Sequence, residues 1–125
     1  MKGQMTDKIR VAHMTDKIRV AHILDAIAEA EKYLRGVSFD GFMANSEKRF
    51  ATIKQIEIIG EACGQITPAF KEANPEIEWG PIKGFRNISI HEYFGVNFHI
   101  VWEIAQNDLP VLKEQFSKIL PGIST

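Results

Sequence analysis

The sequence lacks the features of a membrane protein and of a disulfide-stabilised one. It contains one cysteine, Cys63, so no disulfide can form within the chain and a cysteine-based metal site is excluded. Its longest apolar runs span a few residues, as at Ile58-Ile59, far short of the roughly 20 residues that cross a bilayer. The N-terminus shows no basic segment followed by an apolar core and a cleavage site. We therefore expect a cytoplasmic protein with no membrane association.

A strong charge of either sign is also missing. Fifteen basic and 16 acidic residues leave a net charge of −1, which argues against bulk electrostatic capture of nucleic acid. If RNA is the substrate, a local positive field must attract it, and the candidates are Lys48, Arg49, Lys54, Lys83 and Arg86. The 45% hydrophobic and 25% charged composition is typical of globular proteins, and 125 residues suffice for one domain.

The N-terminal region contains a perfect repeat, since MTDKIRVAH at residues 5–13 recurs at residues 14–22. Nine helical residues at about 100° each rotate the second copy by roughly half a turn from the first, so the two copies cannot line the same core. A duplicated helical turn is one interpretation, and a vector-derived or start-site segment is the one we favour. We expect residues 14–125 to form the domain and residues 1–13 to be a vector-derived or duplicated segment.

Hydrophobic periodicity predicts an all-α fold, a four- to five-helix bundle. The first helix is expected from Thr15 to just before Gly36, and a long central helix follows from an N-cap at Ser46. The first helix has its expected apolar face at Ile18, Ala21, Leu24, Ala28 and Tyr33 or Leu34. The second has its main stripe at Phe50, Ile53, Ile56, Gly60, Cys63 and Thr67, with Ile59 and Ile66 beside it. A stripe this wide predicts a helix at the centre of the bundle.

Shorter elements are expected in the rest of the chain. Residues 37–45 predict a connector with a short helical turn, and Pro68 and Pro75 bound another short stretch. Pro81 fits the first turn of a further helix, because its missing N–H costs nothing there. Asn97 is the expected cap of a last helix, in which Pro110 predicts a kink near residues 107 and 108.

The segment GFRNISIHEYFG, residues 84–95, concentrates the chemically active side chains of the sequence. Histidine moves protons near neutral pH, and arginine supplies a permanent planar cation for charge that builds on phosphorus. Arg86, His91 and Tyr93 are therefore the candidate site. A structural alternative is that Arg86 pairs with an acid such as Glu92 and that His91 caps the end of a helix.

The segment from Arg86 to Tyr93 has the Arg-x4-His-x-Tyr form and resembles the HEPN domain family. The surrounding sequence is similar to the toxin branch of that family, which is paired with minimal nucleotidyltransferase antitoxins. The resemblance covers roughly residues 14–120, and its further matches are residues 58–62, 79–87, 91–96, 100–102 and 107–110. It implies an HEPN-like fold and a metal-independent RNA endonuclease, the toxin of a toxin–antitoxin pair, with no cofactor.

The resemblance also assigns roles to individual residues. Arg86 and His91 correspond to the catalytic pair, and Asn87 to a polar neighbour that helps to position them. Tyr93 corresponds to the tyrosine that the nucleotidyltransferase modifies with AMP, which implies an off-switch through competing negative charge. Glu61 matches a recurring acidic position, and whether its role is functional or structural stays open.

The spacing of the motif predicts a homodimer. On an unbroken α-helix Arg86 and Tyr93 lie about 20° apart, whereas Arg86 and His91 lie about 140° apart. One helix therefore cannot direct both catalytic groups at one phosphate unless it ends near Ile90 or two chains share the site. HEPN toxins are typically homodimers with facing motifs, so the resemblance favours the shared site.

Other candidates are weaker. His22 and His99 are expected at the surface, and Trp79 and Trp102 are expected to pack in the core rather than stack on bases. A zinc-protease motif is excluded because Gly95 stands where the second histidine is needed. The alternative function is a non-catalytic helical module that binds a nucleotide or the partner nucleotidyltransferase.

Overall fold

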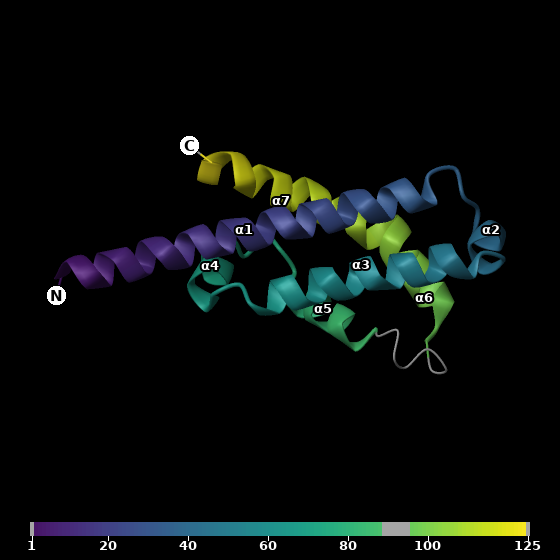
Figure 1. Ribbon diagram of the computed structural model, residues 1–125, viewed down its shortest axis with the longest axis horizontal. Coiled ribbons are helices and arrows are strands. Elements are labelled where there is room, and N and C mark those ends of the chain that lie inside the picture. Colours follow the sequence, from purple (N-terminus) through teal and green to yellow (C-terminus); the bar gives the residue numbers. More distant parts are fainter. Residues whose placement is uncertain (1, 89–95, 125) are drawn as a thin grey trace.

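Two long helices, α1 (Lys2–Leu34) and α3 (Ser46–Gly64), run side by side through the computed structural model (Figure 1). The structure describes residues 2–88 and 96–124, which contain no β-strand, so the all-α prediction is confirmed. The remaining elements are α2 (Phe39–Met43), α4 (Pro68–Ala73), α5 (Trp79–Lys83), η1 (Gly84–Asn87), α6 (Phe98–Glu103), η3 (Ile104–Asp108) and α7 (Leu109–Ser124). No helix in the described part of the chain is long and apolar enough to span a membrane.

The buried face of α1 differs from the predicted one. Ile18 is 53% exposed and Ala28 is also exposed, so the expected face is wrong at these two positions, whereas Leu34 is buried and Leu24 and Tyr33 pack against the core. The buried stripe of α1 includes Leu34 together with Val20, Ile23, Ile27 and Ala30, which the prediction had not placed in the core. These residues are spaced alternately three and four apart and form a second helical stripe, which packs against α3 and α7. Gly36, at φ 72°, follows the helix in the left-handed conformation that glycine adopts readily, as expected for a helix end.

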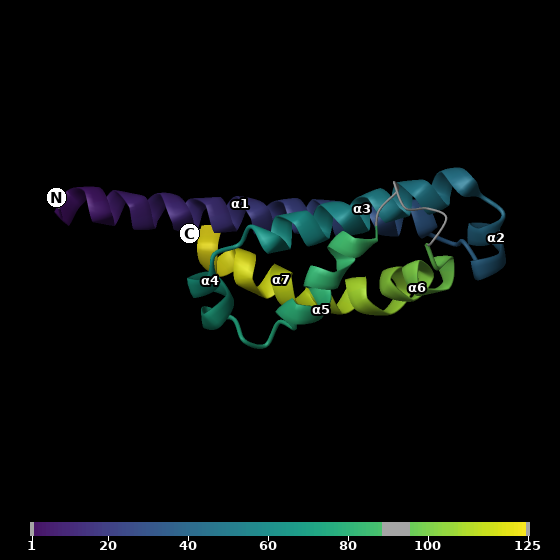
Figure 2. The ribbon, with the colours of Figure 1, turned by 90° about the horizontal axis from the view of Figure 1, so that it is seen from below.

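A buried carboxylate joins α1 to the start of α4. Asp16 is fully buried and accepts hydrogen bonds from the backbone N (2.9 Å) and the Oγ1 (2.7 Å) of Thr67. Thr67 is also the N-cap of α4, because its Oγ1 accepts from Phe70 N at 3.3 Å. Asp16 belongs to the second copy of the repeat, whereas the first turns of α1 extend beyond the other helices (Figures 1 and 2).

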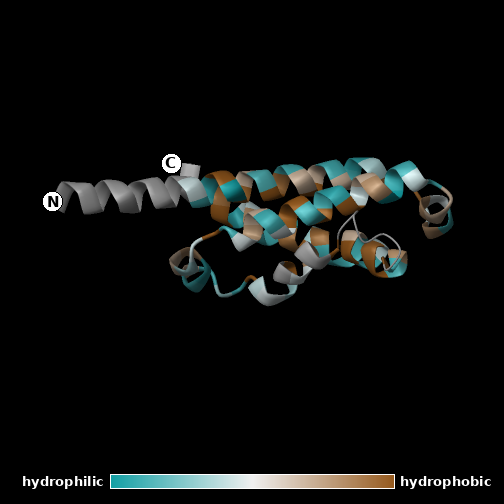
Figure 3. Cartoon of the chain, turned by 60° about the horizontal axis from the view of Figure 1, so that its bottom comes forward, coloured by the Kyte–Doolittle hydropathy of each residue, from teal (hydrophilic) through white to brown (hydrophobic). Residues whose placement is uncertain are grey.

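The helix α3 occupies the centre of the bundle, as predicted. It packs against α1 and against α5 and η1, and the hydropathy colouring shows apolar stretches of α1 and α3 turned toward the other helices (Figure 3). Its N-cap is Asn45 rather than Ser46, since the Asn45 side chain accepts from Lys48 N at 3.0 Å. An asparagine amide oxygen has the reach to satisfy that amide, so the helix begins one residue earlier than the predicted cap would place it.

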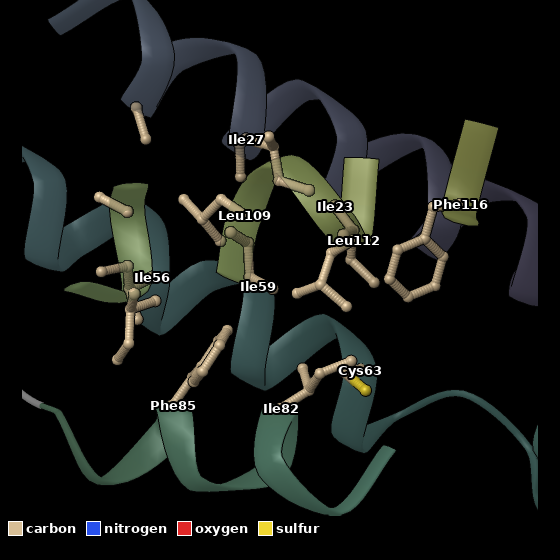
Figure 4. Close-up of a cluster of buried hydrophobic side chains, with 14 of the residues drawn as sticks. Ile23, Ile27, Ile56, Ile59, Cys63, Ile82, Phe85, Leu109, Leu112 and Phe116 are labelled. Atoms are coloured by element: carbon tan, nitrogen blue, oxygen red, sulfur yellow. The ribbon is translucent and has the colours of Figure 1, made fainter. Parts of the chain in front are cut away.

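Side chains of α1, α5, η1 and α7 pack around those of α3 in the core (Figure 4). Ile82 of α5 and Phe85 of η1 point inward from one side, while Leu109 and Leu112 of α7 lie between them and α1. Cys63 is buried in this cluster, and burial raises the pKa of its thiol to about 11 despite the opposing effect of Lys71. The thiol is therefore neutral near pH 7 and acts as a core side chain.

The last helical segment contains the predicted cap and the predicted irregularity. Asn97 caps α6, because its side chain accepts from His99 N (3.0 Å) and Ile100 N (3.3 Å). Between α6 and α7 the backbone widens into the π-helical turn η3. Pro110 has no N–H to donate to the preceding turn, so the wider turn is located where proline interrupts the ladder of hydrogen bonds.

Candidate active site

The candidate motif begins where α5 is followed by a tighter 3-10 helix. The backbone of Arg86 and Asn87 lies in η1, while their side chains are outside the part of the chain that the structure describes. His91 and Tyr93 fall in residues 89–95, which also lie outside the described residues. The structure thus places the backbone of the candidate arginine directly after the buried Phe85.

Apolar contacts anchor the N-terminal side of this segment. Phe85 is 5% exposed and packs in the core, and Ile88 N donates to Phe85 O at 3.2 Å. Ile88 also packs against the core. Ile88 directly follows the 3-10 helix, its N–H continues the three-residue hydrogen-bond spacing of that helix, and both Phe85 and Ile88 pack against the core. These contacts therefore fix the backbone on both sides of Arg86.

This geometry corrects the premise of the angular argument. The 3-10 helix ends at Asn87, and Ile88 is not helical, so an unbroken α-helix does not run from Arg86 to Tyr93. The angles of about 20° and 140° apply only to a continuous α-helix and do not describe this segment. A helix that ended near Ile90 would let one protomer direct both groups at one phosphate, and this helix ends even earlier. The angles therefore do not require a dimer.

The C-terminal side of the motif is held by the start of α6. Val96 and Phe98 pack against the core, and Asn97 between them caps the helix. The ring of Phe98 lies 6.5 Å from that of Phe50 on α3, measured between centroids. The guanidinium of Arg49 lies 4.8 Å above the Phe98 ring. Both ends of the motif segment are therefore fixed to α3 and its neighbours.

Two of the basic residues proposed to attract RNA have structural contacts. Arg49 donates to the backbone oxygens of Phe42, at 3.4 Å, and of Met43, which ties α2 to α3. Lys48 Nζ donates to Tyr33 O at 2.8 Å. Lys54 is 55% exposed and lies 3.6 Å from Glu57, so it is the most accessible of these three. The side chain of Lys83 lies outside the described residues.

The acidic candidate lies on the helix that supports η1. Glu61 is exposed on α3, and α3 packs directly against η1, which carries Arg86. Glu57, which was not among the sequence candidates, lies one turn earlier on the same side of α3. Its Oε2 is buried and has no hydrogen-bond partner among the described residues. The four-residue spacing of Glu57 and Glu61 was the signal that could have indicated a shared face.

The weaker sequence candidates have ordinary structural roles. Trp79 packs against Phe116, with ring centroids 5.7 Å apart, and its Nε1 donates to Asn74 O at 3.0 Å. Trp102 lies 5.2 Å from the Phe42 ring. His99 is 64% exposed and pairs with Glu103 at 3.2 Å. Core packing is therefore confirmed for both tryptophans, and His99 is at the surface.

Comparison with known proteins identifies the family. The profile described as ribonuclease HepT-like matches residues 23–119, which include the whole candidate motif. The chain belongs to this family. It is a family of HEPN-type ribonucleases, which confirms the resemblance found in the sequence.

Individual relatives agree with this membership. A protein of Thermococcus cleftensis named probable ribonuclease HepT is 38% identical over 94 residues, covering 75% of this chain and 86% of its own. A protein of Caldanaerobacter subterraneus subsp. tengcongensis, provisionally named an RNase, is 38% identical over 87 residues, which is 70% of this chain and 78% of that one. A Methanocaldococcus jannaschii protein with the same provisional name is 36% identical over 84 residues, 67% of this chain and 77% of its own. No solved structure matches the chain significantly.

Proposed function

We propose that this protein is a metal-independent RNA endonuclease that uses Arg86 and His91. The observation that carries the proposal is the intact Arg-x4-His motif within the matched ribonuclease region, starting on a helix fixed to the core by Phe85. A motif with both an imidazole and a guanidinium favours an enzyme over a binding module, which has no need for both.

The reaction follows from the chemistry of the two groups. The His91 imidazole takes the proton of a ribose 2′-OH, and the 2′-oxygen attacks the adjacent phosphorus. The bond to the 5′-oxygen breaks, and that oxygen leaves with a proton from an imidazolium. Arg86 stabilises the charge that builds on the phosphoryl oxygens. The products are a 2′,3′-cyclic phosphate and a 5′-OH, and Asn87 and Glu61 support the arrangement of Arg86.

The biological role we propose is that of a toxin neutralised by a nucleotidyltransferase antitoxin. Transfer of AMP to the Tyr93 oxygen would add one phosphodiester charge close in sequence to Arg86. That phosphate would compete with RNA for the guanidinium through a charge-assisted hydrogen bond. A homodimer with facing motifs would double the local positive charge and so offset the net charge of −1.

The experiment is RNA cleavage by the purified protein in EDTA, compared with Arg86→Ala and His91→Ala. We expect the wild type to cut and each variant to lose at least about a hundredfold in rate, the effect of removing a proton-transfer or charge-stabilising group. Arg35→Ala, at an exposed position on the loop after α1, is the matched control and should cut normally. Cleavage that stops in EDTA and returns with magnesium or manganese would refute the mechanism.

The alternative is a non-catalytic module that binds a nucleotide or the nucleotidyltransferase, with Tyr93 as the docking or modification point. It predicts that purified protein never cuts RNA yet still binds the transferase, and that Arg86→Ala leaves toxicity unchanged.

A further inference from the structure

A groove of about 250 Å³ lies between α5 and η1 on one side and η3 and α7 on the other. Its floor consists of Ile82, Phe85 and Leu112, which are each at most 5% exposed. Val111, at its edge, is 54% exposed. The groove therefore combines a buried apolar floor with an accessible apolar edge.

Two carboxylates flank this apolar surface, Glu78 at the start of α5 and Asp108 at the end of η3. No basic side chain lines the groove within the described part of the chain, and neither acid makes an ion pair there. Burial, Glu103 and Glu78, in that order, raise the pKa of Asp108. The acids therefore repel each other in the isolated chain, and a cation between them would relieve that repulsion.

We infer that the groove receives an arginine side chain from a protein partner. The methylene groups would lie on Ile82, Phe85 and Leu112, and the guanidinium would lie beside Glu78 and Asp108. Arginine fits better than lysine because its planar cation is less strongly hydrated and binds carboxylates through several donors. A protein segment fits better than a free amine because Val111 offers a contact to an apolar residue next to the arginine.

The groove shares an element with the nuclease motif. Phe85 forms part of its floor and immediately precedes Arg86 on η1. A partner bound here would thus touch the helix that carries the proposed catalytic arginine. The inference itself does not depend on RNA cleavage, and it is tested without that assay.

The test measures peptide binding to the full chain by NMR titration. The probes are acetyl-Leu-Arg-Leu-amide and the same peptide with citrulline, which has a similar shape but no charge. We expect the arginine peptide to shift the groove resonances saturably and to bind about five- to tenfold more tightly than the citrulline peptide, the effect of two partly exposed ion pairs. Glu78→Gln with Asp108→Asn should remove this preference.

The matched control is Asp25→Asn with Glu72→Gln, which neutralises the same two residue types at exposed positions outside the groove. It should keep the preference for arginine. Equal binding of both peptides, or an arginine preference that survives in the groove variant, would overturn the inference. If spermidine bound as tightly as the arginine peptide, the ligand of the groove would be a free amine and not a protein partner. If the chain self-associated and the groove variant did not, the occupant of the groove would be a second copy of the chain.

Discussion

Replacing Asp16 by alanine tests how the N-terminal part of the domain is held. The Asp16 carboxylate accepts two hydrogen bonds from Thr67, at 2.9 and 2.7 Å, and is fully buried. A hydrogen bond to a charged group contributes about 1.5–3 kcal/mol, and a buried donor left unpaired costs a similar amount. The Thr67 hydroxyl can turn toward another acceptor, whereas its backbone N–H cannot. We therefore expect Asp16→Ala to lower the free energy of unfolding by about 3 kcal/mol.

For a chain of this length that loss corresponds to a fall in Tm of about 10 °C. Thermal unfolding followed by circular dichroism at 222 nm measures it, with urea unfolding as the check on free energy. Asp16→Asn should lose about half as much, because the amide oxygen still accepts one of the two bonds. RNA cleavage at 25 °C should be unchanged, since Asp16 and Thr67 join α1 to α4 and not to η1.

The repeat supplies the matched control. Asp7 occupies in the first copy the position that Asp16 occupies in the second. If only the second copy belongs to the domain, Asp7→Ala should change Tm by no more than about 1 °C. An equal fall for both variants would refute the assignment of residues 1–13, and a fall below about 3 °C for Asp16→Ala would refute the energetic argument.

Three further predictions concern control, assembly and pH. Tyr93→Phe should gain no mass when incubated with the cognate nucleotidyltransferase and ATP, whereas the wild type should gain one AMP and stop cutting RNA; equal mass gain would place the modification elsewhere. Light scattering at tens of micromolar should give the mass of a homodimer, and deleting residues 1–13 should leave that state unchanged. The pKa of Asp108 is raised, so the folded chain keeps the Asp108 proton to higher pH than the unfolded chain does. The contribution of Asp108 to the free energy of unfolding therefore falls as pH rises from about 4. Asp108→Asn should therefore reduce that fall in urea titrations, and an unchanged slope would refute it.

Local sequence determined the elements whose ends depend on one or two residues. Gly36 ends α1, Asn97 caps α6, and Pro110 lies at the π-helical turn, because a left-handed backbone, a free amide and a missing N–H are local properties. The wide apolar stripe of α3 likewise predicted its central position. The motif from Arg86 to Tyr93 was recognisable from residue types and spacing alone, and so was the family.

Tertiary structure decided what depends on competition between distant partners. α1 carries two apolar stripes, and contacts with α3 and α7 select the one with Val20 and Ile23. Asp16 meets Thr67 across 51 positions, which no local pattern predicts. The helix that carries Arg86 tightens at Gly84 and ends at Asn87, next to the points where Phe85 and Ile88 pack against the core. The periodicity of the sequence shows which side chains are apolar. Only the packing of the helices decides which of these side chains are buried.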